Sequence, residues 1–134
     1  MSDEILIIGA GVAGINAALN AADYGAKVYL LDDTPSIGGM MARLDKTFPT
    51  NDCSICIEAP QMYEVDNHPN IEILTNTEVK KVKKSDEGFN VRLVKKARFV
   101  DEELCTGCGA CFEACPVTVP DEMDGRIFGT RKLA

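Results

Sequence analysis

The sequence predicts an α/β fold followed by a small cysteine-rich segment, and two observations carry this prediction. Near the N-terminus, a short apolar run, a glycine-rich turn, an amphipathic stretch and a second apolar run follow one another, which is the order strand, helix, strand. Between residues 105 and 115 the chain reads "CTGCGACFEAC", with four cysteines at close spacing. We therefore expect two parts, residues 1–100 and residues 101–134.

The first predicted strand covers residues 5–8, "ILII", which are continuously apolar and end at a glycine. Such a run is typical of a parallel strand that is covered on both faces. A helix is predicted next, because apolar side chains recur at helical spacing at Val12, Ile15, Ala18, Leu19 and Ala22. Gly25 lies where a helix C-terminus favours glycine, and residues 26–33, "AKVYLLDD", predict a second strand. Residues 5–33 thus form one β-α-β unit.

The turn of this unit has the spacing G-x-G-x-x-G at Gly9, Gly11 and Gly14. The first glycine permits a tight turn, the second lets the backbone approach a pyrophosphate, and the third lets the helix pack closely on the strand. Asp32, with Asp33 as the alternative, ends the second strand where a carboxylate can accept a hydrogen bond from a ribose hydroxyl. These features together predict a Rossmann-like unit that binds a dinucleotide.

The cysteine-rich segment has the spacing C-x₂-C-x₂-C-x₃-C-P of bacterial ferredoxins. Its cysteines are Cys105, Cys108, Cys111 and Cys115. In this motif the first three thiolates bind one [4Fe–4S] cluster, and the fourth binds a second cluster that is completed from elsewhere. Four thiolates also suit a zinc ion, but the compact spacing favours the iron–sulfur cluster. We expect part of a ferredoxin-like α+β domain here.

Composition limits the partners and the compartment. The net charge of −7 argues against nucleic acid, which is bound by basic faces. No apolar stretch approaches the roughly 18–20 residues of a membrane span, and the N-terminus "MSDE" is acidic where a secretory signal is basic. Close cysteine spacings favour metal or redox chemistry in a reducing compartment over structural disulfides. We expect a cytoplasmic protein.

Two longer stretches resemble known families. "ILIIGAGVAGINAALNAADYGAKVYLLDDTPSIGG" resembles the FAD-binding start of two-dinucleotide-fold flavoproteins, in which a pair matching Gly38 and Gly39 lies close to the cofactor. The resemblance favours FAD over NAD. "DKTFPTNDCSICI", together with the ferredoxin-type run, resembles the A subunit of heterodisulfide reductase and its relatives, which are iron–sulfur flavoproteins of methanogens and other anaerobes.

The resemblance implies a thioredoxin-reductase-like FAD domain interrupted by an inserted ferredoxin domain. It implies electron transfer between FAD, [4Fe–4S] clusters and the heterodisulfide of coenzymes M and B, with flavin-based electron bifurcation. The implied partners are B and C subunits and a hydrogenase or formate dehydrogenase that supplies electrons, and a homodimer is a further possibility. Family members are longer. Beyond the β-α-β unit, this sequence predicts only a strand at residues 71–74 and a hairpin near residues 77–100, and these elements are too few for a full flavin domain. We expect either a fragment or a short chain whose complement is supplied by a partner chain.

Cys53 and Cys56 form a C-x-x-C pair that is compatible with three chemistries. The resemblance favours metal ligands of an atypical cluster close to the flavin, with further ligands from outside the chain. A redox dithiol and a pair of structural thiols are the alternatives. His68 precedes Pro69 in a predicted turn and is read as a loop residue.

Two other functions compete with an electron-transferring flavoprotein subunit. One is a short noncatalytic ferredoxin-like module that relays electrons or docks partners without binding flavin. The other is a self-contained FAD/NAD(P)H dithiol oxidoreductase, which is disfavoured because a second G-x-G-x-x-G is absent. No constellation of catalytic side chains is visible, so the chemistry is assigned to the cofactors.

Overall fold

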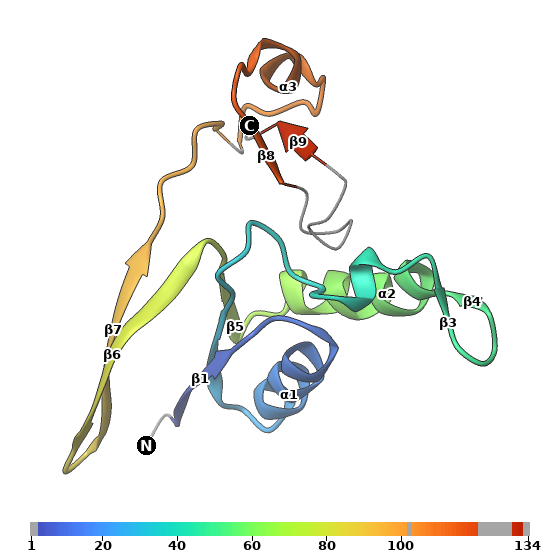
Figure 1. The fold of residues 1–134 in the computed structure, drawn as a ribbon. Coiled ribbons are helices and arrows are strands. Elements are labelled where there is room, and N and C mark those ends of the chain that lie inside the picture. The colour runs from blue at the N-terminus through green and yellow to red at the C-terminus, as the bar shows by residue number, and fades with distance from the viewer. Residues whose placement is uncertain (1–2, 102, 121–129, 133–134) are drawn as a thin grey trace. The chain divides into compact units, whose positions relative to one another are not determined.

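The computed structural model describes residues 3–101, 103–120 and 130–132. The chain divides into two compact units, residues 1–96 and residues 97–134, each of which is described by itself (Figure 1).

The first unit is built on a parallel sheet of three strands in the order β1-β2-β5. These strands are β1 (Glu4–Ile8), β2 (Lys27–Leu31) and β5 (Ile71–Leu74). Helix α1 (Val12–Asp23) connects the first two strands, and α2 (Ser54–Asn67) lies between β2 and β5 in the chain. Because right-handed crossovers that advance in one direction place their helices on the same face, α1 and α2 both lie on one side of the sheet (Figure 1). The predicted β-α-β unit and the strand at residues 71–74 are confirmed.

The core lies between α1, α2 and the sheet. Its main members are Ile15, Ala18, Leu19, Ala22, Val28, Leu30, Val65 and Ile71. The alanines of α1 let the helix approach the sheet closely, and the leucine and isoleucine side chains fill the remaining space. Past the helix end Gly25 has φ +90° and donates its N–H to the carbonyl of Ala22 (2.9 Å). The chain then turns directly into β2, as glycine at this position allows.

Strand β1 is less buried than its sequence predicts. Ile5 is 38% exposed and Ile8 is 63% exposed, so the prediction that this strand is covered on both faces is wrong. Within the described residues β1 pairs only with β2, which makes it an edge strand. The two helices cover one face of the sheet (Figure 1). Strand β1 also borders an open groove that is lined in addition by Val82, Phe89 and Val91.

Helix α2 is an element that the sequence reasoning did not predict. A short hairpin of β3 (Lys46–Thr47) and β4 (Asp52–Cys53) leads into it, after the single helical turn η1 (Met41–Arg43). Cys53 is the N-cap residue, and Pro60 lies inside the helix. Proline interrupts helix hydrogen bonding, so it argues against a helix when the sequence is read alone. Tertiary contacts with α1, η1 and β5 stabilise the helix instead.

The predicted hairpin is present as β6 (Thr77–Ser85) and β7 (Gly88–Lys95), paired antiparallel with mostly exposed side chains. The second unit contains α3 (Ala110–Ala114) and the pair β8 (Thr118–Pro120) and β9 (Thr130–Lys132). Within the described part of the chain, every helix is too short or too polar to cross a bilayer.

Candidate functional site

The glycine turn connects β1 to α1, and its three glycines differ in backbone conformation and in the space around each Cα. Gly9 has φ +100°, a conformation that side chains disfavour. A Cβ at Gly14 would lie 1.8 Å from the carbonyl oxygen of Gly9, so the helix and the strand end meet where only glycine fits. A Cβ at Gly11 would meet nothing closer than the Cα of Gly39 at 3.8 Å. The chain itself therefore leaves space at Gly11.

Gly38 and Gly39 lie directly against this turn. The N–H of Gly38 donates to the carbonyl of Ala10 (2.7 Å), and Gly11 and Gly38 form an isolated parallel bridge. A Cβ at Gly39 would lie 2.8 Å from the Cα of Gly11. The structure thus brings together the glycine fingerprint and the Gly-Gly pair, which are far apart in the sequence.

Asp32 joins the same cluster from the residue after β2. Its Oδ2 accepts a hydrogen bond from the N–H of Ala10 (2.7 Å), and its Oδ1 accepts from the N–H (2.9 Å) and hydroxyl (2.6 Å) of Thr34. Burial opposes ionisation, but the hydrogen bonds from Thr34 and Ala10 outweigh it and lower the pKa of Asp32. Asp33 is exposed, so the structure turns Asp32 toward the glycine turn. Oδ2 keeps capacity for one more hydrogen bond.

These residues fit a dinucleotide. Within the described residues no side chain caps the N-terminus of α1, and the first turn of this helix contains no acidic residue, so its N–H groups are available to a pyrophosphate. The space beside Gly11 is where a Cβ would obstruct such a group. Sequence reasoning missed Thr34, whose place two residues after Asp32 is the usual spacing of an Asx-type turn.

We expect Asp32→Asn to lower the free energy of unfolding by about 2 kcal/mol, because asparagine has one acceptor oxygen and cannot serve both Ala10 and Thr34. A lowered pKa contributes stability that is complete above the ordinary value of 3.8 and is lost as the pH falls toward the folded-state value. The difference between the two proteins should therefore shrink in acid. Urea unfolding at several pH values measures it, with exposed Asp33→Asn as the control. A difference that is the same at every pH would contradict the role assigned to this carboxylate.

The ferredoxin-type cysteines lie in the second unit. None is in a disulfide; Cys105, Cys108 and Cys111 are exposed and Cys115 is partly exposed. Among the described residues no three Cys, His, Asp or Glu side chains come together as a metal-binding group, so the structure does not gather the four sulfurs.

The local chain nevertheless fits a cluster by its donor chemistry. Gly107 (φ +70°) and Gly109 (φ +81°) have left-handed backbones, and Gly109 is the N-cap residue of α3. The N–H of Ala110 and then the hydroxyl of Thr106 lower the pKa of the Cys108 thiol. Hydrogen bonds that favour thiolate are those that a cluster ligand needs.

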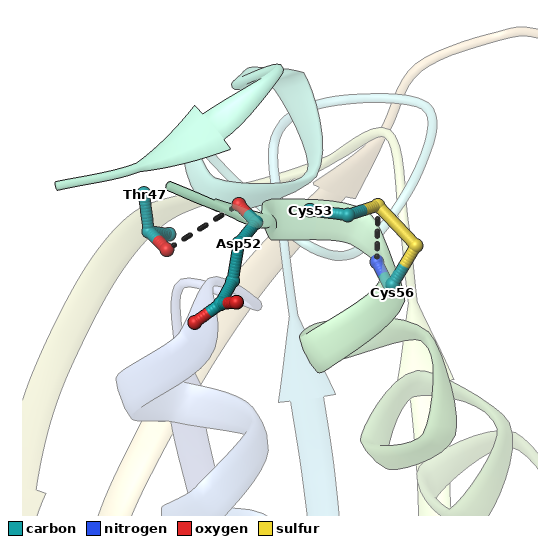
Figure 2. The surroundings of a disulfide bond; sticks show 4 residues. All are labelled: Thr47, Asp52, Cys53 and Cys56. Carbon is teal, nitrogen blue, oxygen red and sulfur yellow. Dashed lines mark hydrogen bonds between the residues drawn. A yellow bond between two sulfur atoms is a disulfide. The ribbon is translucent and has the colours of Figure 1, made fainter. Parts of the chain in front are cut away.

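Cys53 and Cys56 are joined by a disulfide at the start of α2 (Figure 2). Both residues are exposed, and the N–H of Cys56 donates to the Sγ of Cys53 (3.3 Å). In this state neither sulfur is a thiolate that could bind a metal. The metal-ligand prediction for this pair concerns the reduced thiols and stays a prediction.

Two buried polar side chains on α2 were missed by the sequence reasoning. Ser54 and Glu58, one helical turn apart, are fully buried, with Glu58 only 1% exposed. Among the described residues, the Ser54 hydroxyl and both Glu58 carboxyl oxygens have no hydrogen-bond partner. Burial raises the pKa of Glu58. Nothing in the sequence distinguishes Glu58 from the exposed Glu64 of the same helix.

Glu58→Gln should make the chain more stable than the natural protein at about pH 8, by about 1 kcal/mol. Because the folded-state pKa is raised above the ordinary 4.5, the folded chain keeps a proton that the unfolded chain releases, and stability falls as the pH rises from 4.5 through the folded-state pKa. Glutamine carries no such proton, so the advantage should vanish below 4.5. Denaturant unfolding between about pH 4 and pH 8 measures this difference in the free energy of unfolding, with Glu64→Gln as the control. A stability advantage of Glu58→Gln that persists below pH 4.5 would contradict the explanation.

Comparison with known proteins agrees with both parts of the chain. The family model described as FAD dependent oxidoreductase matches residues 4–52, and that described as 4Fe-4S binding domain matches residues 98–120. The chain is 56% identical over 132 residues to the second iron–sulfur A subunit of the CoB–CoM heterodisulfide reductase of Methanopyrus kandleri, covering 98% of this chain and 20% of that protein.

A second relative, the iron–sulfur A subunit of the CoB–CoM heterodisulfide reductase of Methanocaldococcus jannaschii, is 57% identical over 127 residues, covering 95% of this chain and 19% of the relative. The chain thus spans about a fifth of the length of these curated relatives. Among solved structures, thioredoxin reductase of T. acidophilum matches with a TM-score of 0.58 and 27% identity, covering 68% of this chain and 30% of that one. The Rossmann-like fold class is confirmed by this likeness and by the family model.

Proposed function

The chain belongs to the family of heterodisulfide reductase iron–sulfur A subunits, and from that premise we propose that it holds a flavin and an iron–sulfur cluster for electron transfer in a complex of the heterodisulfide reductase type. One observation carries the proposal. A single chain contains both a dinucleotide cradle and a ferredoxin-type cysteine run. The cradle consists of the glycine turn, the Gly-Gly pair and Asp32. Each of the two parts matches the corresponding family model.

The residues divide the work between two groups. FAD would be held by Gly9, Gly11, Gly14, Asp32, Gly38 and Gly39. Cys105, Cys108 and Cys111 would bind a [4Fe–4S] cluster, and Cys115 would serve a second cluster completed from elsewhere. When bound, these groups would supply one- and two-electron redox chemistry.

The polypeptide's own contribution is binding and positioning. The N-terminus of α1, which no side chain of the described residues caps, offers N–H groups and a positive dipole end to the pyrophosphate, and the ionised Asp32 holds the turn through Ala10. The N–H of Ala110 stabilises the charge on the Cys108 sulfur. No side chain is assigned a catalytic proton transfer.

The whole complex would reduce a disulfide, since both relatives are A subunits of a CoB–CoM heterodisulfide reductase. We place the disulfide-reducing step on partner subunits of the B and C type. Electrons would enter from a hydrogenase or formate dehydrogenase, with bifurcation at the flavin. A cytoplasmic location accords with the close cysteine spacings, which favour metal or redox chemistry in a reducing compartment.

The test uses the assembled complex that contains this chain. Replacing Cys108 with serine in that complex should lower disulfide reduction driven by its electron-input subunit by at least about tenfold, because the cluster on this chain relays the electrons. The control is reduction of the same disulfide by a viologen dye that donates directly to the partner subunits, which should be unchanged. Turnover at the full rate, driven by the electron-input subunit, in a complex that lacks this cluster's EPR signal would contradict the proposal. A complex without bound flavin would show that the chain is only a relay module.

A further inference from the structure

The disulfide between Cys53 and Cys56 lies on the surface of the first unit, at the N-terminus of a fourteen-residue helix (Figure 2). Cys53 is the N-cap residue, and its sulfur takes the place of the oxygen that usually caps a helix by accepting the N–H of Cys56 (3.3 Å). The Sγ of Cys53 therefore lies at the helix N-terminus, where the backbone N–H groups and the positive end of the helix dipole are found.

The β3–β4 hairpin fixes the position of Cys53 independently of the disulfide. Lys46 is the cross-strand neighbour of Cys53, and Thr47 donates its hydroxyl to the carbonyl of Asp52 (3.4 Å; Figure 2). The N–H of Ser54 donates to the carbonyl of Asp45 (3.3 Å). Opposite residues of an antiparallel pair share a face, so the side chains of Lys46 and Cys53 leave the same face of the hairpin. None of these contacts involves the sulfur–sulfur bond.

A structural role explains little about this disulfide. It links residues three positions apart, and the entropy removed from an unfolded chain is smallest for short loops. The hairpin and the helix already hold the two residues together. Exposure of both cysteines leaves the bond open to attack, which is the property of reactive disulfides.

We propose that Cys53 and Cys56 form a thiol–disulfide exchange site whose reductant is a dithiol. One thiolate of the dithiol attacks the Sγ of Cys56, the bond to Cys53 breaks, and its electron pair leaves on the Sγ of Cys53. The second thiol of the reductant loses its proton and attacks the mixed disulfide, which releases Cys56 as a thiolate. The two cysteines take up two protons, so the dithiol becomes a disulfide while the protein gains two electrons and two protons.

Thiol trapping on the full chain tests this exchange. The chain is equilibrated without oxygen in mixtures of reduced and oxidised dithiothreitol, quenched with iodoacetamide and digested with trypsin. Cleavage after Lys46 and Lys80 leaves both cysteines in the peptide 47–80, whereas the ferredoxin-type cysteines fall in the peptide 99–126. The peptide 47–80 should pass from no label to two labels in one reversible two-electron transition, with unchanged circular dichroism.

Two variants sharpen the test. Lys46→Gln should slow reduction of the pair about two- to fivefold, because the departing Cys53 thiolate loses a positive charge on the same face of the hairpin. In this variant trypsin cuts after Arg43 and not after residue 46, so the pair is followed in the peptide 44–80. Lys84→Gln, which removes an exposed lysine from β6, should leave the rate unchanged, and equal rates in the two variants would contradict the exchange chemistry assigned to this face.

Three results would overturn the proposal. A peptide 47–80 that stays unlabelled at every ratio would identify a structural link. Two labels at every ratio would mean that the disulfide does not form. A fall in bound iron and sulfide in Cys53→Ser or Cys56→Ser chains after cluster reconstitution would identify the pair as cluster ligands.

Discussion

Replacing Gly14 with alanine is expected to destabilise the first unit by about 3 kcal/mol or more, at the upper end of what overpacking costs. The new Cβ would lie 1.8 Å from the carbonyl oxygen of Gly9 and 3.0 Å from its carbonyl carbon, and both are backbone atoms that cannot rotate away. Helix α1 would have to move off β1, which disturbs the core formed by Ile15 and Ala18. Urea unfolding followed by circular dichroism measures the loss.

Gly11→Ala is the matched control for this change. The Gly11 backbone has φ −81°, and its added Cβ would approach no atom closer than 3.8 Å, so stability should change by less than about 1 kcal/mol. The same methyl group would occupy the space proposed for the pyrophosphate, so FAD affinity in equilibrium dialysis should fall at least about tenfold. Normal FAD binding by the Gly11→Ala protein would contradict the cradle, and normal stability of the Gly14→Ala protein would contradict the packing.

The second large effect is expected for Cys108→Ser, which should remove nearly all bound iron and sulfide from the chain. Serine is a poor ligand for this cluster, because its hydroxyl does not ionise as the Cys108 thiol does and oxygen binds iron of such clusters less well than sulfur. Iron and sulfide analysis after anaerobic reconstitution, with EPR of the reduced sample, measures the loss.

Cys115→Ser is the control for the cluster. If the fourth cysteine serves a second cluster, this variant should keep the first cluster and its EPR signal. Equal loss of iron in the two variants would instead indicate one site made of all four thiolates, which is the arrangement that zinc prefers.

The β-α-β unit could be predicted because its signals are local. The glycine spacing fixes the turn, and the apolar spacing of α1 depends only on the helix period. The burial of β1 could not be predicted in this way, because it depends on which strands and helices pack against it. Ile8 is apolar in sequence yet mostly exposed in the structure. Helix α2 was missed because Pro60 argues against a helix, and packing on α1 and β5 outweighs that local signal.

The candidate site was predictable to a similar extent. Asp32 and the glycines follow a fixed spacing, and the structure brings them to one place through Ala10. The exact partners of the carboxylate, such as Thr34, follow from the turn after β2. Glu58 could not be found from the sequence, because its burial arises from how α2 packs in this fold.

The most direct test of the central claim is the cofactor content of the chain purified and reconstituted without oxygen. The claim that one chain holds a flavin and a cluster predicts one FAD per chain and about four iron and four sulfide ions for the first cluster. It also predicts the EPR signal of a reduced [4Fe–4S] centre. Bound zinc without sulfide, together with an absence of flavin, would contradict it.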